Sequence, residues 1–463
     1  MEEFDVAVIG AGSAGYVAAI RAADLGKRVV VVEHREIGGT CLNRGCIPTK
    51  ALLKVAEAYE IVKHSKLFGI SVEGISFDMA AIRKRKERIV KMLVSGIGFL
   101  FKSRKIVVKG GKGKLLDGNV VQVVSASGTE QLMAKDIIIA TGSEPALIPV
   151  FKIDRKNVLT SDEALNLAEL PKDILIVGAG AIGIEFATFL SAFGVKVTVV
   201  EMMPQVIPAL RDKKITSLVK KLLEKRGVKV ITGVKIDGIE VVRDGEVVST
   251  LSNGEEVYTE KVLVSIGRKL NSEGLGLEGL GVKIENGRIN VDTRLRTSVP
   301  NIYAVGDVVG GLLLAHKAMK EGETAAEVIA GMDRQMDYRV VPWVIFSAPE
   351  VASVGLTEEE AKEQGIDVVT GEFPFTANGK AVSMGVTDGE VKVVADANNG
   401  KIVGAQIVGP DASVMISELA LAVENGLSLR DVADTIHTHP TLSEAVMEAT
   451  KDALGEVIHM VKR

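Results

Sequence analysis

Two cysteines, Cys41 and Cys46, are the only thiols in this chain of 463 residues, and both lie in the segment GGTCLNRGCIPTK. A thiolate is a nucleophile and a metal ligand, so two close thiols could exchange disulfides or bind a metal. Residues five apart in a regular helix have Cα atoms roughly 8–9 Å apart, whereas a disulfide requires about 7 Å or less. Gly45 and Pro48 permit the distorted turn that a bridge would need. A bridge strained in this way is readily reduced, as redox catalysis requires.

A zinc site is the alternative, in which Cys41 and Cys46 would combine with His437 and His439. No second cysteine pair strengthens it, and we expect no metal. Two cysteines in so long a chain favour a reducing compartment, and the acidic start MEEFDVAVIG lacks the positive charge of an export signal. We therefore expect a cytoplasmic protein in which any disulfide is catalytic.

A repeated pattern predicts the elements that position the thiols. Residues 4–33 and 173–201 both run strand, G-x-G-x-x-G, helix, strand, acid. Such glycines turn the chain out of the strand, let the backbone approach a pyrophosphate at the helix N-terminus, and allow close helix–strand packing. The acid accepts hydrogen bonds from ribose hydroxyls. The residues of the two copies are Gly10, Gly12, Gly15 and Glu33, and Gly178, Gly180, Gly183 and Glu201.

Two copies predict two dinucleotides, one a held flavin and the other a passing nicotinamide. Met202 and Met203 follow Glu201, and no arginine comes before Arg211. An NADP site would need nearby cations for the 2′-phosphate, so we expect NAD.

The fold class predicted is α/β, and the composition excludes several other classes. The apolar run 174–200 is long enough for a membrane span, but Glu185 lies inside it and its end is β-branched, so a strand, a helix and a strand are favoured. A net charge of −4 argues against nucleic acid or an anionic membrane as the main partner. The basic stretch 83–104 is typical of a solvated amphipathic helix.

GGTCLNRGCIPTK resembles the active-site segment of the pyridine nucleotide–disulfide oxidoreductases. The resemblance extends over nearly the whole chain. It implies two Rossmann-like dinucleotide-binding domains and a C-terminal α+β dimerisation domain. The matching segments, besides the two glycine patterns, are IIIATGSEP (137–145), VSIGRKLN (264–271), TSVPNIYAVGDV (297–308), LLAHKA (313–318) and IHTHPTLSEA (436–445). The expected domains are 1–145 and 268–340 for FAD, 146–267 for NAD, and 341–463 for the interface.

The resemblance also implies the cofactor contacts. FAD would occupy the N-terminal pattern, with Glu33 on the adenosine ribose and Asp307 on the ribityl chain, and NAD the internal pattern. Lys50 would lie beside the flavin N5 and pair with Glu185. A cation there stabilises negative charge on a reduced flavin. Further cofactor contacts are expected from Gly39, Thr40, Gly113, Thr141, Gly142, Gly267 and Ala315.

The implied chemistry gives the two thiols different roles. Cys41 would exchange disulfides with the substrate, and Cys46 would lie against the flavin. His439 would be the base, oriented by Glu444, and His437 is less suited to that role. The family's base comes from the partner subunit, so a homodimer built through the C-terminal domain is implied.

The implied reaction oxidises protein-bound dihydrolipoyl groups with reduction of NAD. The lipoyl-bearing partner would belong to a 2-oxo-acid dehydrogenase complex or the glycine cleavage system. Two departures stand out: GAGSAG lacks the family's frequent Pro-Gly, and GLLLAHKAMKEG lacks its usual Pro-Met. The rivals are an NADPH-dependent glutathione-type reductase, a mercuric reductase, which needs a second cysteine pair, and a non-catalytic flavin protein.

Overall fold

The computed structural model describes residues 1–242 and 245–461 and divides the chain into two compact units. Unit 1 comprises Met1–Ala51, Asp78–Leu147 and Gly267–Asp337. Unit 2 comprises Leu52–Phe77, Ile148–Ile266 and Tyr338–Arg463. Each unit is described by itself, and the domain boundaries expected from the sequence stay predictions.

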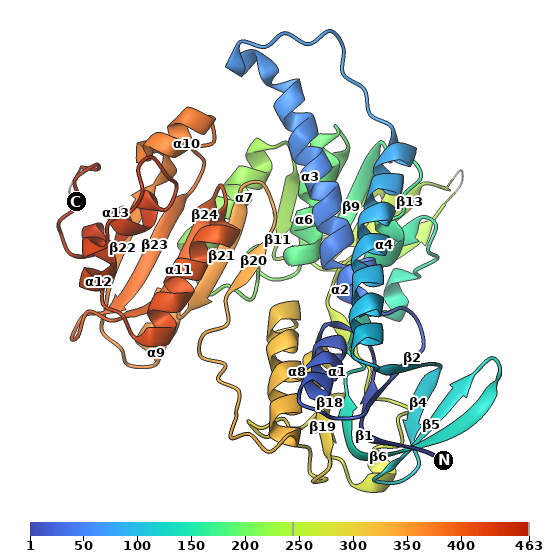
Figure 1. The fold of residues 1–463 in the computed structure, drawn as a ribbon. Coiled ribbons are helices and arrows are strands. Elements are labelled where there is room, and N and C mark those ends of the chain that lie inside the picture. Colours follow the sequence, from blue (N-terminus) through green and yellow to red (C-terminus); the bar gives the residue numbers. More distant parts are fainter. Residues whose placement is uncertain (243–244, 462–463) are drawn as a thin grey trace. The chain divides into compact units, whose positions relative to one another are not determined.

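Unit 1 is built on a seven-stranded sheet in the order β3-β2-β1-β6-β5-β4, with β19 beside β6 (Figure 1). The strands β3, β2, β1, β6 and β19 pair in parallel, while β4, β5 and β6 form an antiparallel meander. Continuous apolar runs such as VVVVE in β2 suit a sheet covered on both faces. The strand bounds are β1 (Glu2–Ile9), β2 (Val29–Glu33), β3 (Val107–Gly110), β4 (Lys112–Leu115), β5 (Val120–Ser125), β6 (Gly128–Ile139) and β19 (Ile302–Ala304).

The helices of unit 1 include a tightly packed pair, α1 (Ser13–Asp24) and α8 (Ala315–Ile329). A Cβ atom at Gly322 would lie 2.3 Å from the carbonyl oxygen of Ala14, so only glycine allows the two backbones to approach so closely. Unit 1 also holds α2 (Gly39–Arg44), α4 (Met79–Ser103), the start of α3 (Cys46–Lys63), the pairs β7 (Ser143–Pro145) with β16 (Arg268–Leu270) and β17 (Ile284–Glu285) with β18 (Arg288–Ile289), and the 3₁₀ turns η4 (Glu278–Leu280) and η5 (Gly306–Val309).

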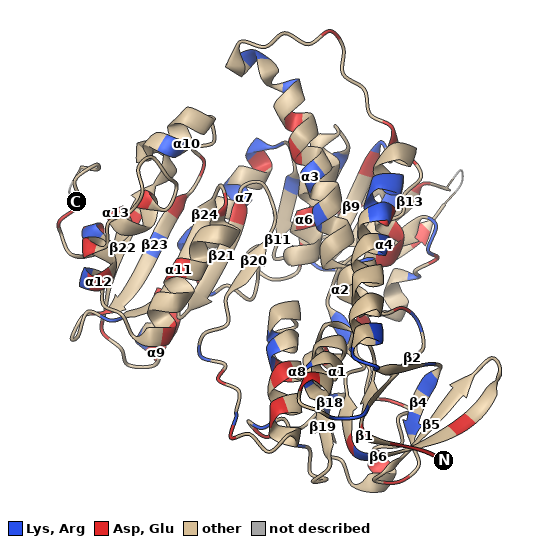
Figure 2. Cartoon of the chain, viewed as in Figure 1, with Lys and Arg blue, Asp and Glu red and all other residues tan. Residues whose placement is uncertain are grey.

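The amphipathic helix expected at 83–104 is confirmed as α4, which begins earlier, at Met79. The side chain of Asp78 caps it by accepting the backbone N–H of Ala80 at 2.8 Å. Figure 2 shows Lys and Arg gathered along the part of α4 that follows this cap. Ile97 and Phe101, near the other end, are buried in the core of unit 1.

Unit 2 contains a parallel five-stranded sheet in the order β11-β10-β9-β15-β8. The apolar run 174–200 forms β9, α6 and β10, as predicted. None of the helices described, in residues 1–242 or 245–461, combines the length and apolar character that crossing a membrane requires. The bounds are β8 (Val158–Leu159), β9 (Asp173–Val177), α6 (Ala181–Ala192), β10 (Lys196–Glu201), α7 (Lys213–Lys225), β11 (Lys229–Thr232) and β15 (Lys261–Val264).

Smaller elements accompany this sheet. An antiparallel meander, β12-β13-β14, precedes the strand β15 in the chain. The bounds are β12 (Ile236–Val241), β13 (Val247–Leu251), β14 (Glu256–Thr259), α5 (Ser161–Ala164), and the 3₁₀ turns η1 (Ser65–Phe68) and η2 (Pro149–Phe151).

The C-terminal part of unit 2 is an antiparallel sheet in the order β20-β21-β24-β23-β22, with helices packed on it (Figure 1). Alternate residues of β23 face opposite sides: Val391 and Val393 join the core with α11 and α13, while Lys392 points the other way. The bounds are β20 (Trp343–Ile345), β21 (Glu350–Gly355), α9 (Glu358–Glu363), β22 (Val368–Pro374), η6 (Phe375–Ala377), α10 (Gly379–Met384), β23 (Glu390–Asp396), β24 (Ile402–Gly409), α11 (Ala412–Asn425), α12 (Leu429–Asp434) and α13 (Glu444–Ala453).

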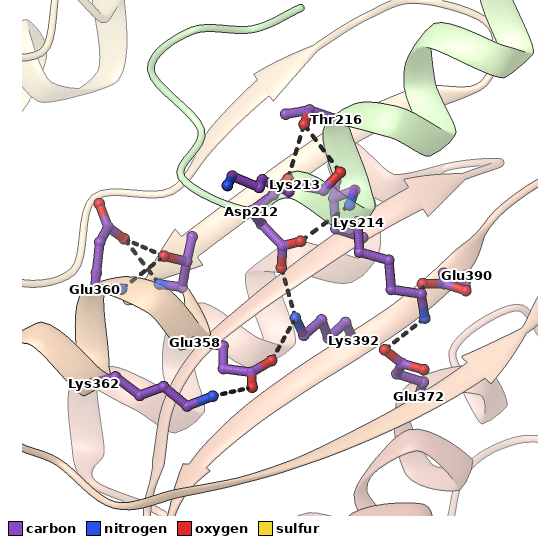
Figure 3. Close-up of polar contacts among 12 residues, drawn as sticks. Asp212, Lys213, Lys214, Thr216, Glu358, Glu360, Lys362, Glu372, Glu390 and Lys392 are labelled. Carbon is purple, nitrogen blue, oxygen red and sulfur yellow. Dashed lines mark hydrogen bonds and ion pairs between the residues drawn. The ribbon is translucent and has the colours of Figure 1, made fainter. Parts of the chain in front are cut away.

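A buried ion pair joins the two parts of unit 2. Lys392 of β23 contacts Asp212 at 2.7 Å and Glu358 at 3.1 Å (Figure 3). The side chains of Lys392 and Asp212 are only 4% and 1% exposed. Asp212 also caps α7 by accepting the backbone N–H of Ile215 at 3.0 Å. Breaking such a pair would leave a charge buried without compensation.

Candidate active site

The two glycine patterns fold into the same turn, with the same role for their acids. Glu33 accepts the backbone N–H of Ala11 at 2.7 Å, and Glu201 accepts that of Ala179 at 2.8 Å. The second oxygen of each carboxylate accepts another backbone N–H two residues further along the chain, at 2.7 Å and 2.8 Å. The sequence predicted acids for ribose hydroxyls, but it did not show that they also hold the turn. A carboxylate has about four acceptor positions, so both roles are compatible.

The first glycine of each pattern lies against the end of a neighbouring strand. A Cβ atom at Gly10 would lie 2.3 Å from the carbonyl oxygen of Ala140, and one at Gly178 would lie 2.5 Å from that of Ser265. Larger residues are therefore excluded at both turns.

The helix starts of the two patterns fit a dinucleotide's pyrophosphate. Gly12 and Gly180 precede α1 and α6, and neither helix start has a side-chain cap. A Cβ atom at Gly180 would meet no described atom within 4 Å, and one at Gly12 would meet only the Cα of Gly39 at 3.9 Å. Uncapped N–H groups beside open space are the donors that a phosphate accepts.

The cysteine segment packs directly on the first of these turns. Gly39, the first residue of α2, has φ +57°, and a Cβ atom there would lie 2.6 Å from the Cα of Gly12. The backbone N–H of Gly38 donates to the carbonyl oxygen of Ala11 at 2.8 Å. Contact with the nucleotide turn therefore requires glycine at position 39, whereas Gly38 is required by its φ of +91° and by the Leu42 side chain, 2.9 Å from where a Cβ atom would lie.

Cys41 and Cys46 are half-buried and lie on successive helices, α2 and α3, separated by Gly45. Gly45 has φ −143° and ψ −112°, so the helix is interrupted between the two, as the spacing required. A hydrogen bond to Cys46 and burial raise the pKa of the Cys41 thiol, against the Ser13 hydroxyl and the charge of Lys50, which lower it. The Cys41 thiol therefore needs a base to become a thiolate.

Asp307 belongs to a polar cluster that the sequence did not reveal. Its carboxylate accepts the Ser143 hydroxyl at 2.5 Å, and Arg268 Nε lies 3.9 Å away. Arg268 in turn donates to the hydroxyl and the carbonyl of Ser143, at 2.6 Å and 2.8 Å. Ser143 and Arg268 lie in the segments IIIATGSEP and VSIGRKLN, which was the only signal available.

A buried side chain of α8 holds the loop before Asp307. Glu321 accepts the backbone N–H of Gly306 at 2.7 Å and pairs with Lys317 at 3.1 Å, and both side chains are almost fully buried. Ala315 is the first residue of α8, so the expected contact residue stands at the start of this helix.

Other expected contact residues are also placed in unit 1. The Thr141 hydroxyl, two residues after β6, donates to the carbonyl oxygen of Asn271 at 2.6 Å. Gly142 (φ +68°) follows Thr141, and Gly267 directly precedes β16. Gly113 lies in β4 and Thr40 in α2. A Cβ atom at Gly113 would lie 2.9 Å from a methyl of Ile9.

In unit 2, His439 Nδ1 lies 2.8 Å from Oε1 of Glu444, as a base and its orienting carboxylate would. Burial favours a higher pKa for Glu444, but the Thr441 N–H and the His439 ring outweigh it and hold that pKa below its ordinary value. The His439 side chain is 78% exposed. It therefore stands open to a partner molecule.

Glu185 is buried in α6, where its Oε1 accepts the backbone N–H of Phe346 at 3.0 Å. Lys50 belongs to unit 1 and Glu185 to unit 2, so their pairing stays a prediction. Among residues 1–242 and 245–461, no group of three or more His, Cys, Asp or Glu side chains is placed to bind a metal ion, so the zinc alternative gains no support.

Comparison with known proteins gives two family matches that together account for most of the chain. Residues 4–322 match the model "Pyridine nucleotide-disulphide oxidoreductase", and residues 341–450 match the dimerisation domain of the same family. The fold class expected from the sequence is confirmed by these matches.

Curated relatives share the full length. Dihydrolipoyl dehydrogenases of Geobacillus stearothermophilus, Bacillus subtilis and Halobacterium salinarum are 46%, 45% and 44% identical to this chain; the alignments cover 99–100% of it and 98% of each relative. Among solved structures, LpdA from Mycobacterium tuberculosis is 27% identical with a TM-score of 0.91, over 97% of this chain and 99% of that one. The HOCl-induced flavoprotein disulfide reductase RclA from Escherichia coli is 28% identical with a TM-score of 0.87, over 96% and 99%.

Proposed function

Because the chain belongs to the pyridine nucleotide-disulphide oxidoreductases, we propose that it is a dihydrolipoyl dehydrogenase, which oxidises protein-bound dihydrolipoyl groups and reduces NAD. The observation that carries the proposal is the thiol pair. Cys41 and Cys46 interact directly, and their segment lies against the nucleotide turn through Gly39 and Gly12. Electrons leaving the dithiol therefore start next to a dinucleotide site.

The cofactors are FAD in unit 1 and NAD in unit 2. When bound, FAD would supply an acceptor for the electron pair of the dithiol, and NAD would supply a hydride acceptor. Uncapped helix starts at Gly12 and Gly180 would hold the two pyrophosphates, and Glu33 and Glu201 the riboses. Asp307, held by Ser143 and Arg268, would bind the ribityl chain.

The chain's own residues carry out a dithiol–disulfide exchange. In the oxidised protein one thiol of the substrate attacks the Cys41 sulfur, the Cys41–Cys46 bond breaks, and a mixed disulfide forms. The second substrate thiol then displaces Cys41, so the substrate leaves as a disulfide and the protein holds two thiols. His439 takes the proton of the attacking thiol, and Glu444 stabilises the imidazolium. The hydrogen bond to Cys46 and burial raise the pKa of Cys41, and the charge of Lys50 opposes that rise.

His439 acts across a homodimer. The dimerisation-domain match at residues 341–450 supports that assembly, as does the exposure of the His439 side chain. Ile436 is 96% exposed, which suits a segment that a second copy covers. The partner in catalysis is a lipoyl-bearing protein of a 2-oxo-acid dehydrogenase complex or the glycine cleavage system. The cytoplasmic location stays a prediction.

A steady-state assay tests the proposal against its rival within the family. Purified protein is supplied with dihydrolipoamide or reduced glutathione, and with NAD or NADP, and nicotinamide reduction is followed. We expect turnover with dihydrolipoamide and NAD at least tenfold above the other combinations, because Glu201 is followed by Met202 and Met203 rather than cations. A reverse assay supplies NADH or NADPH with lipoamide or glutathione disulfide and follows nicotinamide oxidation. Preferential use of NADPH and glutathione disulfide in that assay would instead identify a glutathione-type reductase.

A further inference from the structure

The segment that carries His439 is an irregular loop between α12 and α13, so side chains must fix its shape. One contact lies inside the loop, where the Thr441 hydroxyl donates to the carbonyl oxygen of Thr438 at 2.8 Å. Another comes from outside, where the Asn378 amide donates to the carbonyl oxygen of Thr441 at 3.1 Å. A further contact comes from His437, two residues before His439.

His437 ties this loop to α11. Its Nε2 lies 2.8 Å from Oε1 of Glu418, and its Nδ1 lies 2.9 Å from the carbonyl oxygen of Thr435. The His437 side chain is 5% exposed, while that of Glu418 is 36% exposed. The His437 end of this contact is therefore shielded from water, whereas the Glu418 carboxylate is partly exposed.

Both ring nitrogens of His437 face acceptors. A carboxylate and a carbonyl oxygen have no proton to give, and a neutral imidazole has only one N–H. Both contacts are satisfied together only when the ring carries two protons and a positive charge. His439 differs, because among residues 1–242 and 245–461 its ring contacts a carboxylate through Nδ1 alone. The geometry thus indicates that His437 is a fixed cation and that His439 can act as a base.

We propose that His437 is a positioning residue for the dithiol reaction: as an imidazolium held between Glu418 and the Thr435 carbonyl, it sets the loop that presents His439. The inference rests on the proposed function, and it adds a residue to which the family resemblance assigned no catalytic role. His437 touches no substrate atom. It acts through the backbone that separates it from His439 by one residue, Thr438.

The charged groups around His437 set its pH range. The hydrogen bond to Glu418 raises the pKa of His437, burial opposes it, and the Thr435 carbonyl and the charge of Glu444 also raise it. The folded pKa thus lies above the ordinary value of 6.5. For a raised pKa the contribution is complete below the ordinary value and is lost as pH rises through the folded pKa. The loop therefore loosens on the alkaline side.

Two substitutions of Glu418 separate charge from geometry. Glu418→Ala removes the partner of a buried cation. Glu418→Gln keeps the shape, and its amide can donate to Nε2 of a neutral His437 whose Nδ1–H still donates to Thr435. The matched controls are Glu424→Ala and Glu424→Gln, at an exposed position on the same helix.

Glu418→Ala is expected to lower kcat for dihydrolipoamide oxidation by tenfold to about 100-fold, with KM for NAD unchanged. Glu418→Gln is expected to restore kcat to within about threefold of wild type and to remove the alkaline loss of rate attributed to His437. NADH oxidation by ferricyanide, which does not need the dithiol base, should be the same in all four variants. A Glu418→Ala variant within twofold of Glu424→Ala, or a Glu418→Gln profile that follows Glu424→Gln, would overturn the proposal.

Nuclear magnetic resonance gives a readout that does not depend on turnover. The chain has six histidines, so ¹⁵N-histidine labelling yields few ring signals. The His437 signal is assigned as the one lost in His437→Gln. In the wild type it should remain that of a doubly protonated ring above pH 6.5, and in Glu418→Gln the change to a neutral ring should occur at a lower pH than in the wild type. A His437 signal that titrates at or below 6.5 in the wild type would overturn the proposal. If the wild type fails to oxidise dihydrolipoamide, the proposed function fails, and the titration still decides the charge of His437.

Discussion

The Nδ1 atom of His439 lies 2.8 Å from Oε1 of Glu444, and the Thr441 backbone N–H binds the other carboxylate oxygen at 2.8 Å. The Thr441 N–H thus holds the Glu444 carboxylate independently of its contact with the His439 imidazole. Its contact with Nδ1 leaves Nε2 to accept a proton, which is the tautomer a general base requires.

His439→Gln tests this arrangement. Glutamine cannot take a proton at neutral pH, so dihydrolipoamide oxidation should fall by about 10²–10⁴-fold. NADH oxidation by ferricyanide should stay at the wild-type rate. The control is His459→Gln, which removes a second histidine–carboxylate pair, His459 with Glu448 at 3.0 Å, and should leave both rates unchanged. Near-normal dithiol oxidation in His439→Gln would remove it as the base.

The two acids of the glycine patterns should give reciprocal effects. Glu201→Gln retains one acceptor where the backbone of Ala179 and Met203 needs two, so NAD binding should weaken. Hydrogen bonds to charged groups contribute about 1.5–3 kcal/mol, which predicts an increase in KM for NAD of about tenfold or more. The flavin content should not change.

Glu33→Gln supplies the comparison for that prediction. It should lower the flavin-to-protein absorbance ratio of the purified protein and leave KM for NAD unchanged, because Glu33 holds the turn of unit 1. If either variant altered both cofactors equally, the assignment of one acid to each dinucleotide would be wrong.

The buried pair of Lys392 and Asp212 predicts a large effect on stability. Lys392→Met leaves the Asp212 carboxylate buried without its cation, which should lower the free energy of unfolding by about 3–5 kcal/mol. Lys225→Met, which breaks the exposed contact with Asp388 at 2.7 Å, should lower it by less than about 1 kcal/mol. Trp343, the only tryptophan, lies in the same sheet as Lys392 and reports urea unfolding by fluorescence.

The same pair predicts an alkaline limit to stability. Burial lowers the pKa of Lys392, but the hydrogen bonds and charges of Asp212 and Glu358 outweigh it, so that pKa lies above its ordinary value of 10.5. A raised pKa gives stability that is complete below 10.5 and is lost as pH rises through the folded value. The difference between wild type and Lys392→Met should therefore shrink above that pH. A difference that stayed constant would contradict the ionic account.

Gly39→Ala tests the contact between the cysteine segment and the nucleotide turn. Its Cβ would lie 2.6 Å from the Cα of Gly12 at a φ of +57°, so the two backbones must separate. We expect loss of bound flavin and of dithiol oxidation. Gly96→Ala in α4 meets nothing within 4 Å and should stabilise the protein by about 0.5–1 kcal/mol. Normal flavin content in Gly39→Ala would show that the close approach is not required.

The sequence predicted most of the framework because its signals are local. The two glycine patterns fixed β1, α1 and β2 and their copies β9, α6 and β10, and the apolar periodicity fixed α4. The interruption between Cys41 and Cys46 followed from Gly45 and the length of a helical turn. These inferences needed no knowledge of distant contacts.

What the sequence could not show depends on residues far apart in the chain. Ser143 meets Asp307 across 164 positions and Arg268 across 125, so neither contact has a local signal. Asp212 meets Lys392 across 180 positions. The contacts of Glu33 and Glu201 with backbone N–H groups join residues that are closer in the chain. The pattern places the acid at the same position whether its carboxylate binds the turn or a ribose, so the pattern alone did not reveal the contact with the turn.

The most direct test of the central claim measures the redox state of Cys41 and Cys46 after each step of electron transfer. Oxidised protein under argon receives one equivalent of dihydrolipoamide, then NAD, with alkylation and mass spectrometry of Cys41 and Cys46 after each addition and absorbance at 340 nm throughout. The dithiol should make both cysteines alkylatable, and NAD should reverse this while about one equivalent of NADH forms. NADH formation with both cysteines unmodified throughout would contradict the account.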